Sequence, residues 1–376
     1  MNNFLGVIQL NNSANANKIF QVFKDKYSDS LTGDNVEAQR FLFKIYGNDS
    51  KRNLTYIYES SKKNISICGY SRIDNKKDLV TSLGINSSET DKEILLKAYI
   101  KWGSKLPNKI IGSFAFVIYD SKLNKFICFR DHMGMKPFYY YKNNDVFIFS
   151  SRIKLLLEMN CIKKVINKNR VIDYLMFVDP KDGETFYNDV FKLPRSHILE
   201  YTDNNFSISK YFEFNINIKS KFKSEEEYFQ KFKDILFEVV DSHINSDDGN
   251  IGIAYSGGLD STSLLKIADN LANNKSIFSK SAIFKNLEEK DRRLVDEKYF
   301  MDLGLDNNNY VKHEYIYFED DGPIKNIDDA LEIFDEPISA INFYIFKGIA
   351  LSLREKKRSD DELSQELLFE LQGKSI

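Results

Sequence analysis

The sequence predicts two different folds in one chain: a sandwich of antiparallel sheets with flanking helices, followed by an α/β domain built on a parallel sheet. In the first half, apolar runs separated by short polar turns predict β-hairpins. In the second half, short apolar runs alternate with amphipathic helical patterns, which is typical of a parallel sheet. The chain has 376 residues, enough for two domains.

The elements of the first half follow from local patterns. Thr90 and Glu93 form a capping box that opens a helix with apolar residues on one face. In the strand predicted within residues 110–120, the side chains on both faces are apolar. Both faces of this strand must therefore be covered, so its sheet must lie inside a sandwich. The other elements that the pattern predicts are a strand over 126–131, a hairpin over 137–151, a helix over 168–177 and a hairpin over 197–211.

The second half begins after a stretch without strong periodicity, residues 214–223, which we take as the boundary between domains 1–215 and 216–376. A second capping box, Ser224 to Glu227, opens an amphipathic helix. The predicted elements that follow are strands over 251–255, 280–284 and 310–318, with helices after the first strand, from Asp291 and after Asn326. In such a sheet, ligands bind at the carboxyl ends of the strands.

One of those strand ends carries the string Ser256-Gly257-Gly258-Leu259-Asp260-Ser261. The strand before it and the helix expected from Asp260 or Ser261 aim free amides and the positive end of a helix dipole at one point. Adjacent glycines allow positive φ and a close backbone approach. This elbow predicts a phosphate site, although neither a Walker A loop nor a dinucleotide G-x-G-x-x-G is present. The alternative is a tight β–α turn that binds no ligand.

Composition narrows the class of protein. The net charge of −2 gives no basic field for nucleic acid, so no nucleic-acid partner is expected. No apolar run is long enough for a membrane span, and the first residues lack the pattern of a leader, so we expect no membrane partner. Three widely spaced cysteines predict reduced thiols in a cytoplasmic protein, and the four histidines form no zinc pattern with them.

The elbow resembles the pyrophosphate loop of the asparagine synthetase family and related ATP pyrophosphatases, whose α/β domain is of the adenine-nucleotide α-hydrolase type. The resemblance implies ATP and Mg²⁺ as cofactors and adenylation of a small-molecule or peptide carboxylate. It also implies that the hydroxyls of Ser256 and Ser261 and the loop amides hold phosphates, and that Asp260 helps to hold the metal. The residues assigned to ATP are Tyr255, Ser256, Gly257, Gly258, Leu259, Asp260, Ser261 and Ile283, with Tyr255 and Ile283 flanking the adenine and ribose.

The first half is similar to a class II glutamine amidotransferase domain, an αββα sandwich of the N-terminal nucleophile hydrolase type. The blocks that carry the similarity are residues 72–79, 90–99, 112–120, 129–141 and 191–201. The family's nucleophile is a cysteine at position 2, where this chain has Asn2, and its N-G-E block is replaced by Tyr70-Ser71-Arg72-Ile73. Only Asp91 matches a glutamine-binding position, and it also reads as an ordinary first-turn helix charge. We therefore expect no glutamine hydrolysis.

The R-I-D-N block, residues 72–75, is similar to the asparagine-synthetase-like cyclases of lasso-peptide clusters, in which the substrate supplies the amine. Three activities stay open: an ATP-dependent amide ligase, a macrolactam-forming cyclase of lasso-peptide or β-lactam type, and a non-catalytic nucleotide-binding homologue. The sequence identifies no catalytic residue for any of them.

The family's second glycine-rich loop, S-G-x-G-x-D-E, has no match near residues 358–363. We expect from this a truncated, incomplete second domain. The same reasoning predicts that a helix over 340–357 exposes an apolar face, to be covered by a second copy of the chain or by a partner protein.

Overall fold

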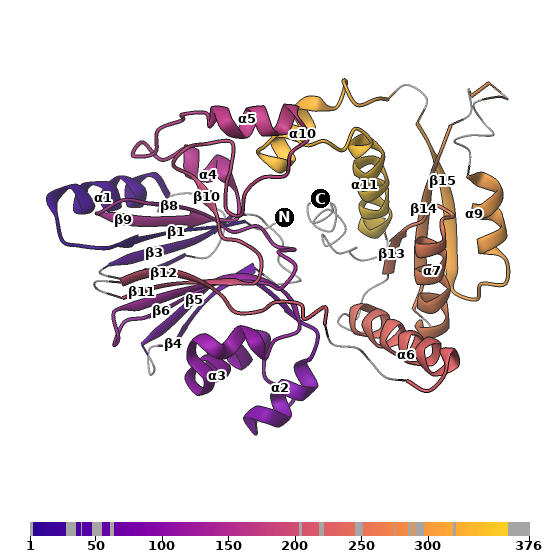
Figure 1. Ribbon diagram of the computed structural model, residues 1–376, viewed down its shortest axis with the longest axis horizontal. Coiled ribbons are helices and arrows are strands. Elements are labelled where there is room, and N and C mark those ends of the chain that lie inside the picture. Colours follow the sequence, from indigo (N-terminus) through magenta and orange to yellow (C-terminus); the bar gives the residue numbers. More distant parts are fainter. Residues whose placement is uncertain are drawn as a thin grey trace. The chain divides into compact units, whose positions relative to one another are not determined.

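A computed structural model describes residues 3–27, 35–38, 40–46, 55–60, 64–202, 205–217, 222–244, 251–273, 275–284, 287–288, 290, 297–318 and 321–359. The chain forms two compact units, which are described separately (Figure 1). The first contains the residues up to Phe214 together with the short segment Phe334–Glu336. The second contains Asn215–Ile333 and the chain from Pro337 on.

Two antiparallel six-stranded sheets form the centre of the first unit. One has the order β10-β8-β9-β1-β3-β2, and its strands are β10 (Phe191–Lys192), β8 (Tyr139–Lys142), β9 (Val146–Ser150), β1 (Asn3–Gln9), β3 (Phe41–Tyr46) and β2 (Asn35–Ala38). The other has the order β12-β11-β7-β6-β5-β4, and its strands are β12 (Asn205–Lys210), β11 (His197–Thr202), β7 (Lys125–Arg130), β6 (Gly112–Asp120), β5 (Ile65–Ile73) and β4 (Thr55–Ser60).

Helices cover both outer faces of this pair of sheets, as the sequence predicts (Figure 1). Every residue of β6 after Gly112 is buried, because one apolar face meets the opposite sheet and the other meets helices. The helices of this unit are α1 (Ala14–Tyr27), α2 (Lys76–Leu83), α3 (Asp91–Trp102), the 3₁₀ turn η1 (Gly103–Asn108), α4 (Ile153–Leu157) and α5 (Lys168–Leu175). The αββα sandwich and the predicted hairpins are therefore confirmed, as is the capping box of α3.

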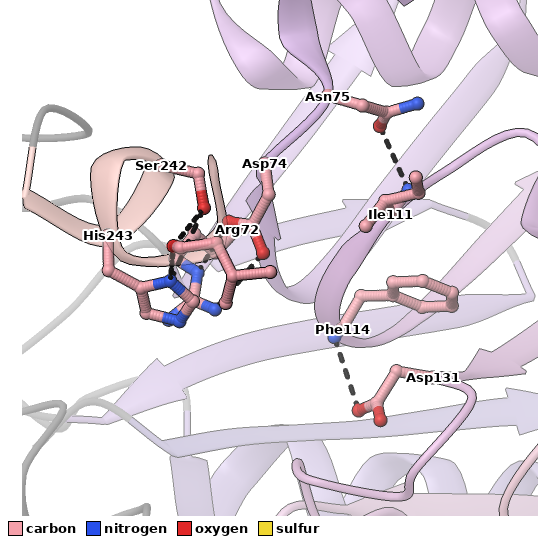
Figure 2. A network of polar contacts seen from close by, with 9 residues as sticks. Arg72, Asp74, Asn75, Ile111, Phe114, Asp131, Ser242 and His243 are labelled. Carbon is pink, nitrogen blue, oxygen red and sulfur yellow. Dashed lines mark hydrogen bonds and ion pairs between the residues drawn. The ribbon is translucent and has the colours of Figure 1, made fainter. Parts of the chain in front are cut away.

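Two buried charged residues, Arg130 and Asp131, fix one of the connections that cross from one sheet to the other. β7 ends at Arg130, and β8, in the opposite sheet, follows a short loop. The Asp131 carboxylate accepts hydrogen bonds from the amide of Phe114 in β6, as Figure 2 shows, and from the loop amides of Met133, Met135 and Lys136. The Arg130 guanidinium donates to carbonyl oxygens of the same loop and of the chain after β10. Both side chains are almost fully buried.

The second unit is built on a parallel sheet of order β13-β14-β15, as the alternating pattern predicts (Figure 1). Helices α6, α7 and α9 share an apolar cluster with one face of the sheet, and α11 packs on the other face. The elements are α6 (Glu225–Ile244), β13 (Ile251–Ala254), α7 (Leu259–Leu271), β14 (Ile277–Ile283), α9 (Lys298–Leu305), β15 (Val311–Tyr317), α10 (Ile327–Phe334) and α11 (Phe343–Ser359).

The prediction of an exposed apolar face on the helix over 340–357 is largely wrong. In α11, Ile349 and Leu353 are buried against Phe278 of β14, so the described sheet already covers that side of the helix. Of the described apolar residues between 341 and 353 that led to the prediction, only Ile341 and Leu351 are exposed. The larger exposed apolar stripe lies on α6, where the exposed side chains are Tyr228, Phe229, Phe232, Ile235 and Val239.

Three sequence predictions, those for Asn2, for a helix starting at Asp291 and for residues 360–363, lie outside the described residues. Of the helices in the described part of the chain, none combines the length and the apolarity needed to cross a bilayer.

We predict that Asp131→Asn destabilises the first unit by ~2–3 kcal/mol, because an amide nitrogen would face backbone N–H groups that now have an acceptor. Urea unfolding followed by circular dichroism measures the change. The matched control is Asp179→Asn, at an exposed loop position of the same unit. Equal midpoints for the two variants would show that the buried carboxylate does not stabilise the crossing loop.

Candidate functional site

The elbow predicted from the sequence follows β13 directly and forms the N-terminus of α7. Gly258 is the N-cap residue in extended conformation, so the helix begins at Leu259, one or two residues earlier than predicted. The amides of the first helical turn have no partner within the helix, and Asp260 places a carboxylate in the same turn. Leu259 and Asp260 are exposed. Donors and a carboxylate therefore meet at an accessible strand end.

Two serine hydroxyls close this loop on itself. The Ser261 hydroxyl accepts a hydrogen bond from the Ser256 amide at 3.2 Å and donates to the Gly258 carbonyl at 3.1 Å. The Ser256 hydroxyl lies 3.1 Å from that of Ser261 and accepts from the Gly258 amide at 3.3 Å. The hydroxyls that the resemblance assigns to phosphate thus lie side by side and hold the loop in shape. A bound anion would replace these weak internal bonds with charge-assisted ones.

Gly257 is required where it stands. Its φ of +78° is in the left-handed region, and a Cβ there would lie 2.8 Å from the Met301 amide nitrogen of α9. Gly258, by contrast, has an ordinary φ of −68°, and a Cβ would approach only the Ser256 hydroxyl, at 3.3 Å. The elbow therefore depends on a close approach between its backbone and α9.

Contacts with α9 support the elbow, and the sequence patterns did not predict them. The hydroxyl of Tyr255 donates to the Met301 carbonyl at 3.1 Å, and Gly304 leaves room for that tyrosine ring. The Ser281 hydroxyl of β14 donates to the Tyr255 carbonyl at 2.5 Å. Ser281, Met301 and Gly304 belong to no local motif. The glycine in the apolar helix of residues 298–305 was the one available signal of a close approach.

Tyr255, which the resemblance assigns to the adenine and ribose, has a side chain that is 1% exposed and packs in the apolar cluster between the sheet and its helices. Ile283, at the end of β14, is also mostly buried in that cluster. The exposed part of the predicted set is therefore the loop itself, from Ser256 to Ser261.

A half-buried histidine of the second unit packs against Tyr255. His313 of β15 has Nδ1 2.7 Å from the Ser279 hydroxyl, and burial lowers its pKa to about 4. The ring is therefore neutral at pH 7 and packs edge-on against Tyr255 and Tyr315. Among the described residues, no group of three or more His, Cys, Asp or Glu side chains is arranged to hold a metal ion.

The positions that match the glutamine site of class II amidotransferases have different contacts here. Asp91 lies 3.3 Å from the Lys76 ammonium, which fits the reading of a first-turn helix charge. Arg72 forms a two-point ion pair with Asp74, with a shortest distance of 2.8 Å (Figure 2). Cys68 and Cys128 are buried in the sheet, and burial raises the pKa of both thiols. No thiolate nucleophile is formed at these cysteines near neutral pH.

Comparison with known sequences finds two family profiles that match separate regions of the chain. A profile described as "Glutamine amidotransferase domain" matches residues 61–212, and one described as "Asparagine synthase" matches residues 231–350. A Methanocaldococcus jannaschii relative, assigned by name to the glutamine-hydrolysing asparagine synthetases, is 28% identical over 81% of this chain and 56% of its own length. Asparagine synthetase 1 of Bacillus subtilis is 27% identical over 63% of this chain and 37% of its own.

The two profiles, in this order on one chain, and these relatives show that the chain is similar to asparagine synthetases. The aligned region spans about half or less of the length of these relatives. Among solved structures, glutamine phosphoribosylpyrophosphate amidotransferase of Bacillus subtilis aligns with 78% of this chain and 70% of its own at 10% identity, with a TM-score of 0.34. That score is too low to bear on the assignment.

We predict that Gly257→Ala destabilises the second unit by more than the ~1–2 kcal/mol that a left-handed alanine costs, because the methyl group also meets α9. Gly258→Ala is the control, and it should change the midpoint little. Thermal unfolding of both variants gives the comparison. Equal midpoints would mean that the elbow backbone adapts and that its approach to α9 is not required.

Proposed function

We propose that this chain binds Mg-ATP at the elbow of residues 256–261 and takes part in ATP-dependent amide formation without hydrolysing glutamine. The observation that carries the proposal is the elbow: first-turn amides, two serine hydroxyls and an exposed carboxylate at the end of a parallel strand. Amides and hydroxyls are donors for phosphate oxygens, and a helix N-terminus adds positive potential. The similarity to asparagine synthetases supports the same reaction class.

Asp260 is the residue proposed to reach Mg²⁺. Magnesium usually takes one or two protein carboxylates together with phosphate oxygens and water, so a single exposed aspartate beside a phosphate loop fits its needs. When bound, the ion would neutralise charge on the departing pyrophosphate. The chain's own part is to orient the phosphates with the loop amides and with the hydroxyls of Ser256 and Ser261.

The nitrogen is proposed to come from an amine substrate. Arg72, in the block that replaces N-G-E, forms an ion pair with Asp74, and the described cysteines have raised thiol pKa values. A carboxylate activated as its acyl-adenylate would then be attacked by an amine of a small molecule or peptide. The R-I-D-N block supports a cyclase of this kind, acting on its own substrate's amine, as the more specific form of the proposal.

We also propose that the protein acts in the cytoplasm.

We predict that the purified chain releases no glutamate from glutamine. A coupled glutamate assay tests this, with a glutamine-hydrolysing asparagine synthetase as positive control and heat-treated protein as blank. Glutamate release above the blank that scales with the protein concentration would overturn this part of the proposal.

We predict that Mg-ATP binding is lost in the double variant Asp260→Ala with Ser261→Ala, which removes the metal carboxylate and the hydroxyl that closes the loop. Isothermal titration with ATP and with AMP measures it, and AMP should bind more weakly because it lacks the phosphates that the loop is proposed to hold. The control is Ser263→Ala, an exposed hydroxyl farther along the same helix. Undiminished ATP affinity in the double variant would place the nucleotide elsewhere.

A further inference from the structure

Tyr255 is the last residue before the elbow of residues 256–261. The regular pairing of β13 with β14 ends one residue earlier, where Ala254 faces Lys280. The Tyr255 amide still donates to the Lys280 carbonyl at 2.9 Å and so continues the ladder by one bond. The direction in which the chain enters the elbow is therefore set at Tyr255.

The first anchor of Tyr255 is on its main chain. Its carbonyl oxygen accepts a hydrogen bond from the Ser281 hydroxyl of β14 at 2.5 Å. Ser281 is 0% exposed, and a buried hydroxyl that loses its partner is costly, so the bond is kept. This side chain ties the end of β13 to the neighbouring strand at the point where the chain turns into the loop.

The second anchor is the Tyr255 hydroxyl, which reaches α9. It donates to the Met301 carbonyl at 3.1 Å, and the Phe300 carbonyl lies 3.4 Å away. The helix comes this close because of Gly304, where a Cβ would lie 2.1 Å from the hydroxyl oxygen. The tyrosine side chain is 1% exposed, so water does not compete for its bond. One residue is thus fixed by β14 at its carbonyl and by α9 at the far end of its side chain.

The loop that follows has only weak bonds of its own. The hydrogen bonds among Ser256, Gly258 and Ser261 measure 3.1 to 3.3 Å, at the long end of the usual range. Its close external contact is again with α9, since a Cβ at Gly257 would lie 2.8 Å from the Met301 amide nitrogen. The shape of the elbow therefore depends on the segments that hold its entrance.

A phosphate site gains affinity when its donors are in place before the ligand arrives, because the cost of ordering the loop is then not taken from binding. We propose that Tyr255 is the positioning residue of this site: through its anchors on Ser281 and Met301 it fixes the elbow in the shape that binds the phosphates of Mg-ATP. The effect on phosphate binding rests on the proposed function, whereas the anchoring of the loop does not.

Removal of one anchor at a time, in the full chain, tests the proposal. Tyr255→Phe keeps the ring and removes the hydroxyl, and Ser281→Ala removes the bond to the Tyr255 carbonyl. Isothermal titration with Mg-ATP and with Mg-pyrophosphate should give affinities lower by ~3- to 10-fold, the contribution of one hydrogen bond. AMP binding should change less, because AMP lacks the phosphates that the loop is proposed to hold. Circular dichroism identifies a temperature at which every variant is folded, and the titrations are made there.

Ser279→Ala and Tyr299→Phe are the matched controls. Ser279 is 0% exposed like Ser281 and lies on the same face of β14, but its hydroxyl bonds His313 and not the elbow. Tyr299 is an exposed tyrosine of α9. Both controls should bind Mg-ATP as the wild type does. Undiminished affinity in both Tyr255→Phe and Ser281→Ala would overturn the proposal. So would an equal loss in Ser279→Ala, which would make the two serines stabilisers of the sheet only.

Hydrogen exchange, followed by NMR without ligand, separates this proposal from the proposed function. The Thr262 amide donates to the Gly258 carbonyl at 2.9 Å, in the first turn of α7. Its exchange should be at least ~3-fold faster in Tyr255→Phe and Ser281→Ala, and unchanged in the two controls. If wild-type protein binds neither Mg-ATP nor Mg-pyrophosphate, the proposed function fails, while faster exchange at Thr262 still supports the anchoring by Tyr255. Unchanged exchange at Thr262 in both variants would overturn that anchoring.

Discussion

The first unit depends on the buried pair Arg130 and Asp131, because the chain passes between its two sheets at this point. Burying two charges is expensive, and it is repaid only when every remaining hydrogen-bonding group has a partner. Here the carboxylate takes four backbone amides and the guanidinium takes three backbone carbonyls, so the loop's polar groups and the charged groups satisfy each other. The Tyr211 hydroxyl donates to the Arg130 carbonyl and ties the segment after β12 to the same place. The apolar sheets supply most of the burial, and this pair fixes the connection between β7 and β8.

Sequence patterns predicted the elements well where the signal was local. The doubly apolar strand of residues 112–120 and the hairpins around it needed no knowledge of distant contacts, and the capping box at Thr90 fixed the start of α3. The α11 prediction failed for a physical reason. Periodicity shows that a helix has an apolar face, but it does not show what covers that face. Phe278 of β14, which covers it here, lies about 70 positions earlier in the chain, beyond the reach of any local pattern.

The same limit applies to the site. The elbow could be predicted because strand, glycines and helix are contiguous, and its loop geometry follows from those residues alone. Its support could not be predicted, since the contacts of Met301 with the elbow and of Tyr255 with α9 join distant segments. Tyr255 illustrates the difference between adjacency and orientation. It immediately precedes the loop, yet the alternation of side chains along β13 turns it into the core, leaving the next residue, Ser256, exposed.

The sandwich is stabilised by an apolar core and by a buried pair of charged residues. Its core consists of apolar strand residues and the Arg130–Asp131 pair. In the same unit, Arg152 and the Phe186 amide bind the carboxylates of Asp335 and Glu336. Buried carboxylates with dedicated partners thus hold both the loop after β7 and this short segment in the first unit.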